Sequence, residues 1–382
     1  MKIPLSNPDI TELEKETVLA VLYTPNLSLG PKLDEFENKF AEYIGSKYSV
    51  AVNSGTSGLH LCVKALDIHD GDSVITSPFS FVASANCLLF ERANPVFVDI
   101  DEKTLNMDIA HLEEKIRAMK DGDKNLRAIL PIHIFGRPCE MDDIMKLARK
   151  HELYVIEDAC EAVGAEFLIE KTWKKVGSFG NCGVFAFYPN KQMTTGEGGM
   201  IVTDDENIYK LCRSMRNQGK TENDAWLQHE RLGYNYRISE INCALGIAQL
   251  ERIEEILDKR ERVAHLYNEK LMDMDELVIP QIENNKKISW FVYVVRLVDR
   301  YSQEDRDYVL KQLKARGIGC SNYFSPIHLQ PFYRKMFGYK KGDFPITEKI
   351  SERTIALPFF NNLPEEQIEY VCENVKEILS FL

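Results

Sequence analysis

Seven short apolar runs, most of them separated by longer amphipathic stretches, constrain the fold of this chain more than any other feature. The runs cover residues 48–53, 73–77, 95–100, 127–135, 154–157, 183–188 and 200–205. Each has the length and composition of a buried strand, and most intervals can hold a helix. Strands that alternate with helices form layered α/β domains. We therefore predict an α/β large domain with a mixed, mostly parallel seven-stranded sheet.

The last two predicted strands form an exception to this alternation. Only residues 189–199 separate them, and a connection between parallel neighbours normally requires a dozen or more residues, usually including a helix. The pair is therefore either antiparallel or connected across the sheet in another way.

The C-terminal third of the sequence predicts a smaller α+β domain. Ser239 is a suitable N-cap for a long helix that reaches Leu271, and this helix is our candidate hinge. A strand at 290–298, a helix at 302–316, an extended segment at 318–324 and a closing helix after Pro364 follow. We place the large domain at residues 1–245 and the small domain at 246–382. We also expect the N-terminal segment to pack on the small domain and its first helix to start at Asp9.

Composition and charge exclude several classes of function. The 382 residues carry a net charge of -12 without a long basic run, which argues against nucleic acid as a partner. No apolar run approaches the length of a membrane span, and the first ten residues lack the apolar region of a signal peptide. The nine cysteines include no C-x-x-C pair, which favours reduced thiols. We expect a cytoplasmic protein with no metal ion.

Three motifs follow strands of the predicted sheet. The sequence NSGTSG at 53–58 precedes a helical run, where backbone N–H groups attract phosphate. Asp158 ends the fifth predicted strand, at the edge where ligands bind in parallel sheets. Lys191 lies between an aromatic strand and a turn rich in glycine and threonine. A lysine among apolar groups is poorly solvated as an ammonium ion, which favours its use as an amine nucleophile.

Each motif alone has an ordinary structural explanation, namely a helix cap for the first two and a surface lysine for the third. Their common position favours a shared crevice instead. Pyridoxal phosphate requires all three groups: a phosphate site at Gly55 and Thr56, a carboxylate for the ring nitrogen at Asp158, and an amine for a Schiff base at Lys191. We therefore predict a pyridoxal-phosphate site.

Further motifs give the sequence a resemblance to a known family. They are SPFSFVA at 77–83, EDA at 157–159, YPNK at 188–191, TGEGG at 195–199, GYNYR at 233–237 and PIHLQP at 326–331. With NSGT at 53–56, they resemble the sugar aminotransferases of the DegT/DnrJ/EryC1/StrS family over essentially the whole chain. The resemblance implies fold type I of the pyridoxal-phosphate enzymes, which is aspartate-aminotransferase-like. It also implies a cofactor that cycles between pyridoxal and pyridoxamine phosphate.

The same resemblance implies roles for further residues. Phe81 would lie against the cofactor ring, and Asn235 would reach the phosphate of the neighbouring subunit's cofactor. A homodimer with shared active sites is the expected assembly. Tyr188 and His328 are candidates for contacts to the substrate. A satisfied histidine without a functional role is the alternative for His328.

Two residues depart from the family pattern. The family usually has a serine at the position of Ala186, whose hydroxyl donates to the phosphate, so we expect weaker cofactor binding unless a neighbour substitutes. Many members have glutamine or histidine at the position of Glu161, near the cofactor ring. With its glutamate, this chain is most similar to the branch that includes perosamine synthases.

The resemblance implies a transaminase that moves an amino group from glutamate to a keto sugar nucleotide, such as a 4-keto-6-deoxyhexose, for amino-sugar and polysaccharide synthesis. One alternative is a related sugar dehydratase, but those enzymes have histidine at the position of Lys191. The other is a catalytically silent regulatory protein on the same fold. Loss of Lys191 or Asp158 would have favoured this second alternative, and both are present.

Overall fold

A mixed seven-stranded sheet forms the centre of the computed structural model, which describes residues 2–121, 125–220 and 228–382. The strands lie in the order β1-β9-β8-β5-β4-β2-β3. Their bounds are β1 Tyr48–Val52, β2 Ser73–Thr76, β3 Asn94–Phe97, β4 Leu126–Ile129, β5 Tyr154–Asp158, β8 Cys182–Ala186 and β9 Gly199–Thr203. All seven predicted strands are confirmed. β9 is antiparallel to β1 and β8, and the other neighbours are parallel, so the antiparallel alternative is correct.

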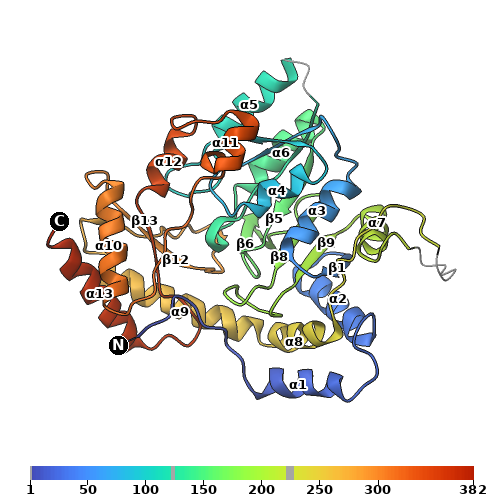
Figure 1. Cartoon of the computed structure of the whole chain (residues 1–382), viewed down its shortest axis with the longest axis horizontal. Coiled ribbons are helices and arrows are strands. Elements are labelled where there is room, and N and C mark those ends of the chain that lie inside the picture. Colours follow the sequence, from blue (N-terminus) through green and yellow to red (C-terminus); the bar gives the residue numbers. More distant parts are fainter. Residues whose placement is uncertain (1, 122–124, 221–227) are drawn as a thin grey trace.

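Helices cover both faces of this sheet (Figure 1). One face carries α3 (Gly55–Ala65), α4 (Ala83–Leu89) and α7 (Glu206–Arg216). The other carries α2 (Pro31–Ile44), α5 (Ile109–Asp121), α6 (Met141–His151) and α8 (Glu240–Glu251). Because both faces are buried, the central strands have nearly continuous apolar sequences instead of an alternating pattern. This explains why they were recognisable from the sequence.

The helix predicted from Ser239 to Leu271 is two helices. Ser239 caps α8 by accepting a hydrogen bond from the Asn242 N–H, and the chain turns at Arg252 before α9 (Ile253–Leu271). In Figure 1, α8 lies beside α1 (Glu12–Leu22), and α9 extends away from α8 and packs against α13 (Glu365–Leu379). The predicted boundary at residue 245 falls inside α8 and stays a prediction.

The start of α1 differs from the prediction. Thr11, not Asp9, is its N-cap, and Glu14 completes the capping box. Asp9 accepts hydrogen bonds from Arg252 and Lys259 instead, so its carboxylate serves a tertiary contact. Farther upstream, Ile3 forms a parallel bridge with Ile318 and belongs to the apolar cluster of the C-terminal region.

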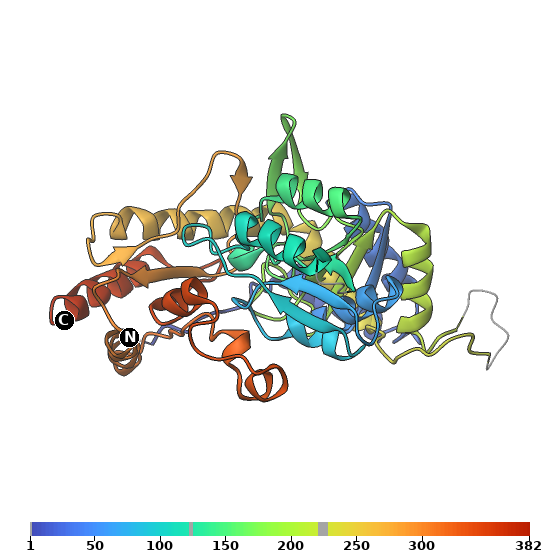
Figure 2. The same cartoon turned by 90° about the horizontal axis from the view of Figure 1, so that it is seen from above.

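The C-terminal region is α+β. A sheet of β10 (Leu277–Val278), β12 (Tyr293–Leu297) and β13 (Thr354–Leu357) is covered by α9, α10 (Gln303–Ala315) and α13. The sequence did not predict β13, α11 (Pro331–Phe337) or α12 (Pro345–Ser351). A small outer sheet of β6 (Glu166–Ile169), β7 (Thr172–Lys175) and β11 (Lys286–Lys287) also escaped prediction because its strands are short and partly polar. Figure 2 shows the β6–β7 hairpin, in green, projecting from the body of the molecule.

Among the described residues, no helix is long and apolar enough to cross a membrane.

Candidate active site

One cavity of about 530 Å³ brings the three sequence motifs together. It lies where β5 and β8 end and α3 begins. Gly55 and Thr56, Asp158, and Lys191 all line it, as the common position of the motifs predicted. Phe291 and the segment 322–324 of the C-terminal region also line it, so the cavity lies between the seven-stranded sheet and the C-terminal region.

The start of α3 forms one end of the cavity, which we call the phosphate end. Ser54 caps the helix by accepting a hydrogen bond of 3.1 Å from the Ser57 N–H. The first N–H groups of a helix have no partner within it, and they attract anions together with the helix dipole. Gly55 is required by close packing, because a Cβ atom there would lie 2.8 Å from both the Ala186 Cβ and the Cys160 Sγ. The absence of a Cβ atom therefore lets α3 begin directly against Ala186 and Cys160 at this end of the cavity.

Asp158 is a buried carboxylate at the end of β5. Its Oδ2 accepts a 2.6 Å hydrogen bond from the Ser84 hydroxyl, and its Oδ1 accepts one of 3.1 Å from the Cys160 N–H. Both donors are neutral, and no described residue forms an ion pair with Asp158. A buried carboxylate is costly without a cationic partner. A protonated ring nitrogen in the cavity would supply the missing charge.

Glu157 lies on the opposite face of the same strand, since successive side chains of a strand alternate. Its carboxylate accepts hydrogen bonds from three backbone N–H groups, of Gly177, Phe179 and Gly180, and it lies 3.0 Å from His133 Nε2. All these contacts lie away from the cavity. Of the two acidic residues in the EDA motif, only Asp158 therefore faces the cavity.

Lys191 forms the other end of the cavity, which we call the lysine end. Its Nζ lies 3.4 Å from Glu161 Oε1 and 3.7 Å from the centre of the Phe291 ring. Glu161 Oε2 accepts a 3.0 Å hydrogen bond from the Phe135 N–H. Burial raises the pKa of the Glu161 carboxyl, and the neighbouring Lys191 ammonium opposes this shift. The Lys191 amine thus faces a buried carboxylate, and only 13% of the lysine side chain is itself exposed.

The remaining predicted residues take different positions. Phe81 and Tyr188 line the cavity, with 61% and 52% of their surfaces exposed. Asn235 is exposed and does not line the cavity of its own chain. His328 also lies outside the cavity. It is fully buried, with its Nε2 3.0 Å from Glu348 Oε1, and the structure does not bring it to the other site residues.

Sequence reasoning missed several residues of the cavity wall. Ser84 holds Asp158, and Phe291 contacts Lys191. Ser84 directly follows the SPFSFVA motif that contains Phe81, and this position in the sequence is the signal that could have found it. Phe291 has no such signal, because an aromatic residue at the start of a strand is ordinary core material. Cys160 also lines the cavity. Burial raises the pKa of its thiol well above the ordinary value, so the thiol stays protonated and serves as a packing group.

The residues present fit pyridoxal phosphate. The phosphate end offers helix N–H groups and a close backbone approach, Asp158 is a buried carboxylate with only neutral hydrogen-bond donors, and the Lys191 amine faces the same space. These groups supply the anion site, the countercharge and the amine that the cofactor uses.

Comparisons with known proteins agree with this geometry. The model of the DegT/DnrJ/EryC1/StrS aminotransferase family matches residues 8–376. GDP-perosamine synthase of Caulobacter vibrioides is 38% identical, over 99% of this chain and 98% of that protein. PseC of Helicobacter pylori, an aminotransferase involved in the biosynthesis of pseudoaminic acid, has a TM-score of 0.92 at 29% identity, with all of both chains covered.

A third similar protein is a putative sugar aminotransferase of Streptococcus pneumoniae in its pyridoxal-phosphate form. It has a TM-score of 0.92 at 25% identity, over 100% of this chain and 99% of that one. The family match, the fold and the fitted cofactor site agree. This chain therefore belongs to the DegT/DnrJ/EryC1/StrS aminotransferase family, a family of pyridoxal-phosphate-dependent sugar aminotransferases.

Proposed function

We propose that this enzyme transfers the amino group of glutamate to a keto sugar nucleotide, of the 4-keto-6-deoxyhexose kind, in the synthesis of an amino sugar for a polysaccharide. The observation that carries the proposal is the meeting of Lys191, Asp158 and the start of α3 in one cavity. The similarity to GDP-perosamine synthase supports a nucleotide-linked sugar.

Bound pyridoxal phosphate supplies an electron sink that lets a proton leave the α-carbon of the amino donor. In our proposal, Lys191 takes up this proton on Nζ as the general base and then delivers it, as the general acid, to the carbon of the cofactor's aldehyde group. Asp158 holds the proton on the ring nitrogen, and Phe81 covers the ring. The N–H groups at Gly55 and Thr56 bind the phosphate and fix the position of the reacting atoms.

The cavity mouth is the proposed sugar site. Tyr188 is exposed there and is the proposed contact for the substrate. The role of His328 as a substrate contact stays a prediction. In the structure its ring is buried against Glu348 and does not line the cavity. We also propose a homodimer, in which the exposed Asn235 of one protomer reaches the phosphate site of its partner.

Lys191 argues against the dehydratase alternative, and the presence of both Lys191 and Asp158 argues against a silent regulatory protein. The test is the absorbance of the protein reconstituted with pyridoxal phosphate. We expect a visible band that disappears when glutamate is added. Keto sugar nucleotides are then screened with glutamate, and mass and NMR identify the aminated product. A band that no amino acid changes would contradict a transaminase.

A further inference from the structure

The amine of Lys191 already has a defined place beside the small domain. Its Nζ lies 3.7 Å from the centre of the Phe291 ring and 3.4 Å from Glu161 Oε1. An ammonium group over an aromatic face is stabilised by the ring quadrupole, more strongly where water is excluded. Phe291 is buried, so this contact is largely desolvated. The ring and the carboxylate together form a site shaped for one cation.

Phe135 links the backbone of Phe291 to the carboxylate of Glu161. The Phe291 N–H donates to the Phe135 carbonyl at 3.1 Å. Phe135 is the residue whose own N–H donates to Glu161. The ring and the carboxylate that face Lys191 are thus fixed to the same short segment. A shift of that segment would move both contacts of the amine together.

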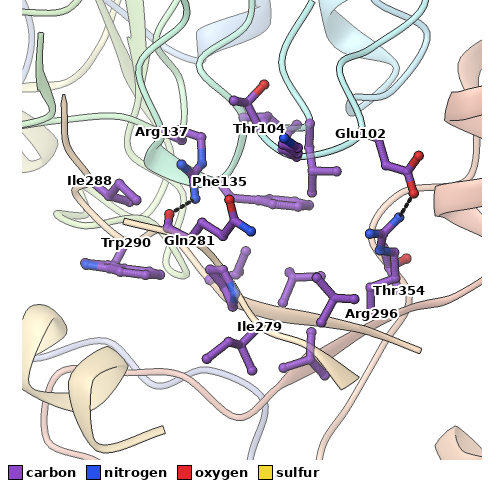
Figure 3. A pocket seen from close by; sticks show the side chains of 18 residues that line it. Glu102, Thr104, Phe135, Arg137, Ile279, Gln281, Ile288, Trp290, Arg296 and Thr354 are labelled. Atoms are coloured by element: carbon purple, nitrogen blue, oxygen red, sulfur yellow. Dashed lines mark hydrogen bonds and ion pairs between the residues drawn. The ribbon is translucent and has the colours of Figure 1, made fainter. Parts of the chain in front are cut away.

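Packing alone does not fix the part of the cavity wall that Trp290 and Phe291 form. A second cavity of about 90 Å³ lies behind it, lined by Phe135 and Trp290 (Figure 3), whereas Phe291 lines the active-site cavity. Trp290 has a φ of +50°, a conformation that bulky side chains rarely adopt. The segment at Trp290 and Phe291 therefore needs polar contacts to keep its shape.

Arg260 supplies these contacts from α9. Its Nε donates to the Trp290 carbonyl at 2.7 Å, and its Nη2 donates to the Phe291 carbonyl at 2.8 Å. Its Nη1 donates to the Asn361 side chain at 2.6 Å. The guanidinium is buried without a carboxylate in contact among the described residues, and burial lowers its pKa to about 9. Two of its three hydrogen bonds thus fix the two peptide groups on either side of the Phe291 Cα.

We propose that Phe291 and Glu161 form a holding site for the Lys191 amine during the part of the reaction in which this lysine is not bonded to the cofactor, and that Arg260 is a positioning residue for this site. A transaminase must free its lysine in each cycle and keep the amine within reach for proton transfer. The holding site retains the amine in the cavity wall, away from bulk water. The inference rests on the proposed role of Lys191.

The first test uses cofactor-free protein and measures acylation of individual lysines by mass spectrometry. The rate at Lys191 is normalised to the exposed Lys15 in the same sample. Phe291→Leu removes the aromatic face, and we expect Lys191 to react about three- to tenfold faster. Phe291→Tyr keeps the face and should stay within about twofold of the wild type. Phe167→Leu removes a buried ring that does not line the cavity and is the matched control.

Arg260→Lys tests the positioning role. It should raise the Lys191 rate less than Phe291→Leu does, because the ring remains but its backbone loses hydrogen bonds. Arg306→Lys is the control, since Arg306 is another buried arginine that donates to backbone carbonyls, of Ser351 and Thr354. Circular dichroism and melting temperature establish that each variant is folded.

The second test measures the equilibrium between the pyridoxal and pyridoxamine forms of the holoenzyme in mixtures of glutamate and 2-oxoglutarate. Lys191 is free in the pyridoxamine form, so Phe291→Leu should shift the equilibrium about three- to tenfold towards the pyridoxal form, and Phe291→Tyr should not. A general loss of packing would not change this ratio selectively.

The outcomes separate the two proposals. The holding site would be overturned if folded Phe291→Leu showed the wild-type rate of Lys191 acylation and an unchanged equilibrium. Equal effects of the leucine and tyrosine variants would overturn it as well. If glutamate fails to convert the wild-type holoenzyme, the proposed amino donor is wrong, while the labelling result still decides on the holding site.

Discussion

The two ends of the active-site cavity are built on different principles. The phosphate end consists of backbone N–H groups and very small side chains, with Gly55 and Ala186 in close approach. The lysine end consists of buried charged and aromatic side chains, namely Lys191, Glu161 and Phe291. The first end therefore depends on the path of the chain. The second depends on side chains that segments far apart in the sequence bring together.

The largest effect is expected at the lysine end. Lys191→Ala should abolish measurable turnover, a loss of about 10⁴-fold or more, because no other described amine lines the cavity. The variant should still bind the cofactor noncovalently, since the phosphate end is unchanged. Steady-state kinetics and equilibrium dialysis measure the two properties, with Lys39→Ala as a control on α2. Loss of cofactor binding would show that the two ends do not act separately.

Asp158 lies between the two ends, and its replacement should have the next largest effect. Asp158→Asn keeps the shape but removes the charge opposite the ring nitrogen, so kcat/KM should fall about ten- to hundredfold. Ser84→Ala, which removes only the 2.6 Å hydrogen bond to Asp158, should cost less. If Ser84→Ala costs as much as Asp158→Asn, orientation of the carboxylate matters more than its charge.

At the phosphate end, Gly55→Ala tests the close approach of the backbone. The new Cβ would lie 2.8 Å from both the Ala186 Cβ and the Cys160 Sγ, so α3 must shift, and we expect cofactor binding to weaken about tenfold. Adding Ala186→Gly removes one of these contacts and should recover part of the loss. Fluorescence titration with cofactor gives the dissociation constants. An unaffected Gly55→Ala variant would show that the backbone approach is not needed.

Ala186→Ser should act in the opposite direction. A hydroxyl at this position can donate to the phosphate, and one hydrogen bond to a charged group contributes about 1.5–3 kcal/mol, so we expect cofactor affinity to rise about ten- to hundredfold. The same titration measures it. If affinity does not rise, a neighbouring donor such as Thr56, which lines the cavity, already fills this role.

The difference between the two ends explains how much the sequence could predict. NSGTSG at 53–58 is contiguous, and EDA at 157–159 ends a recognisable strand, so the sequence could place both motifs at strand ends, where residues of each line one cavity. The central strands were found because both their faces are buried. Phe291 and Ser84 reach the site only through tertiary packing. Likewise, the pairing of His328 with Glu348 joins a loop to α12, which no periodicity in the sequence revealed.

The smallest predicted effect concerns the remote support of the lysine end. Gln249 accepts a 3.2 Å hydrogen bond from the Thr194 N–H, in the turn after Lys191, and donates one of 2.8 Å to Glu14. Burial alone would raise the pKa of Glu14, but hydrogen bonds from Thr11, Arg252 and Gln249 outweigh it and lower the pKa to about 2. The ionised carboxylate therefore stabilises the folded chain above its ordinary pKa of 4.5.

Glu14→Gln should accordingly lower the melting temperature by about 2–4 °C at pH 7. Because the folded-state pKa lies below the unfolded-state value, the stabilisation in the wild type is lost as the pH falls from 4.5 towards 2, so the difference between the two proteins should shrink over that range. Glu12→Gln, in the same helix but largely exposed, is the control and should show little change. If the difference in melting temperature stays constant down to pH 3, Glu14 acts through the shape of its side chain and not through its charge. The remote support of the lysine end would then depend on packing, as the phosphate end does.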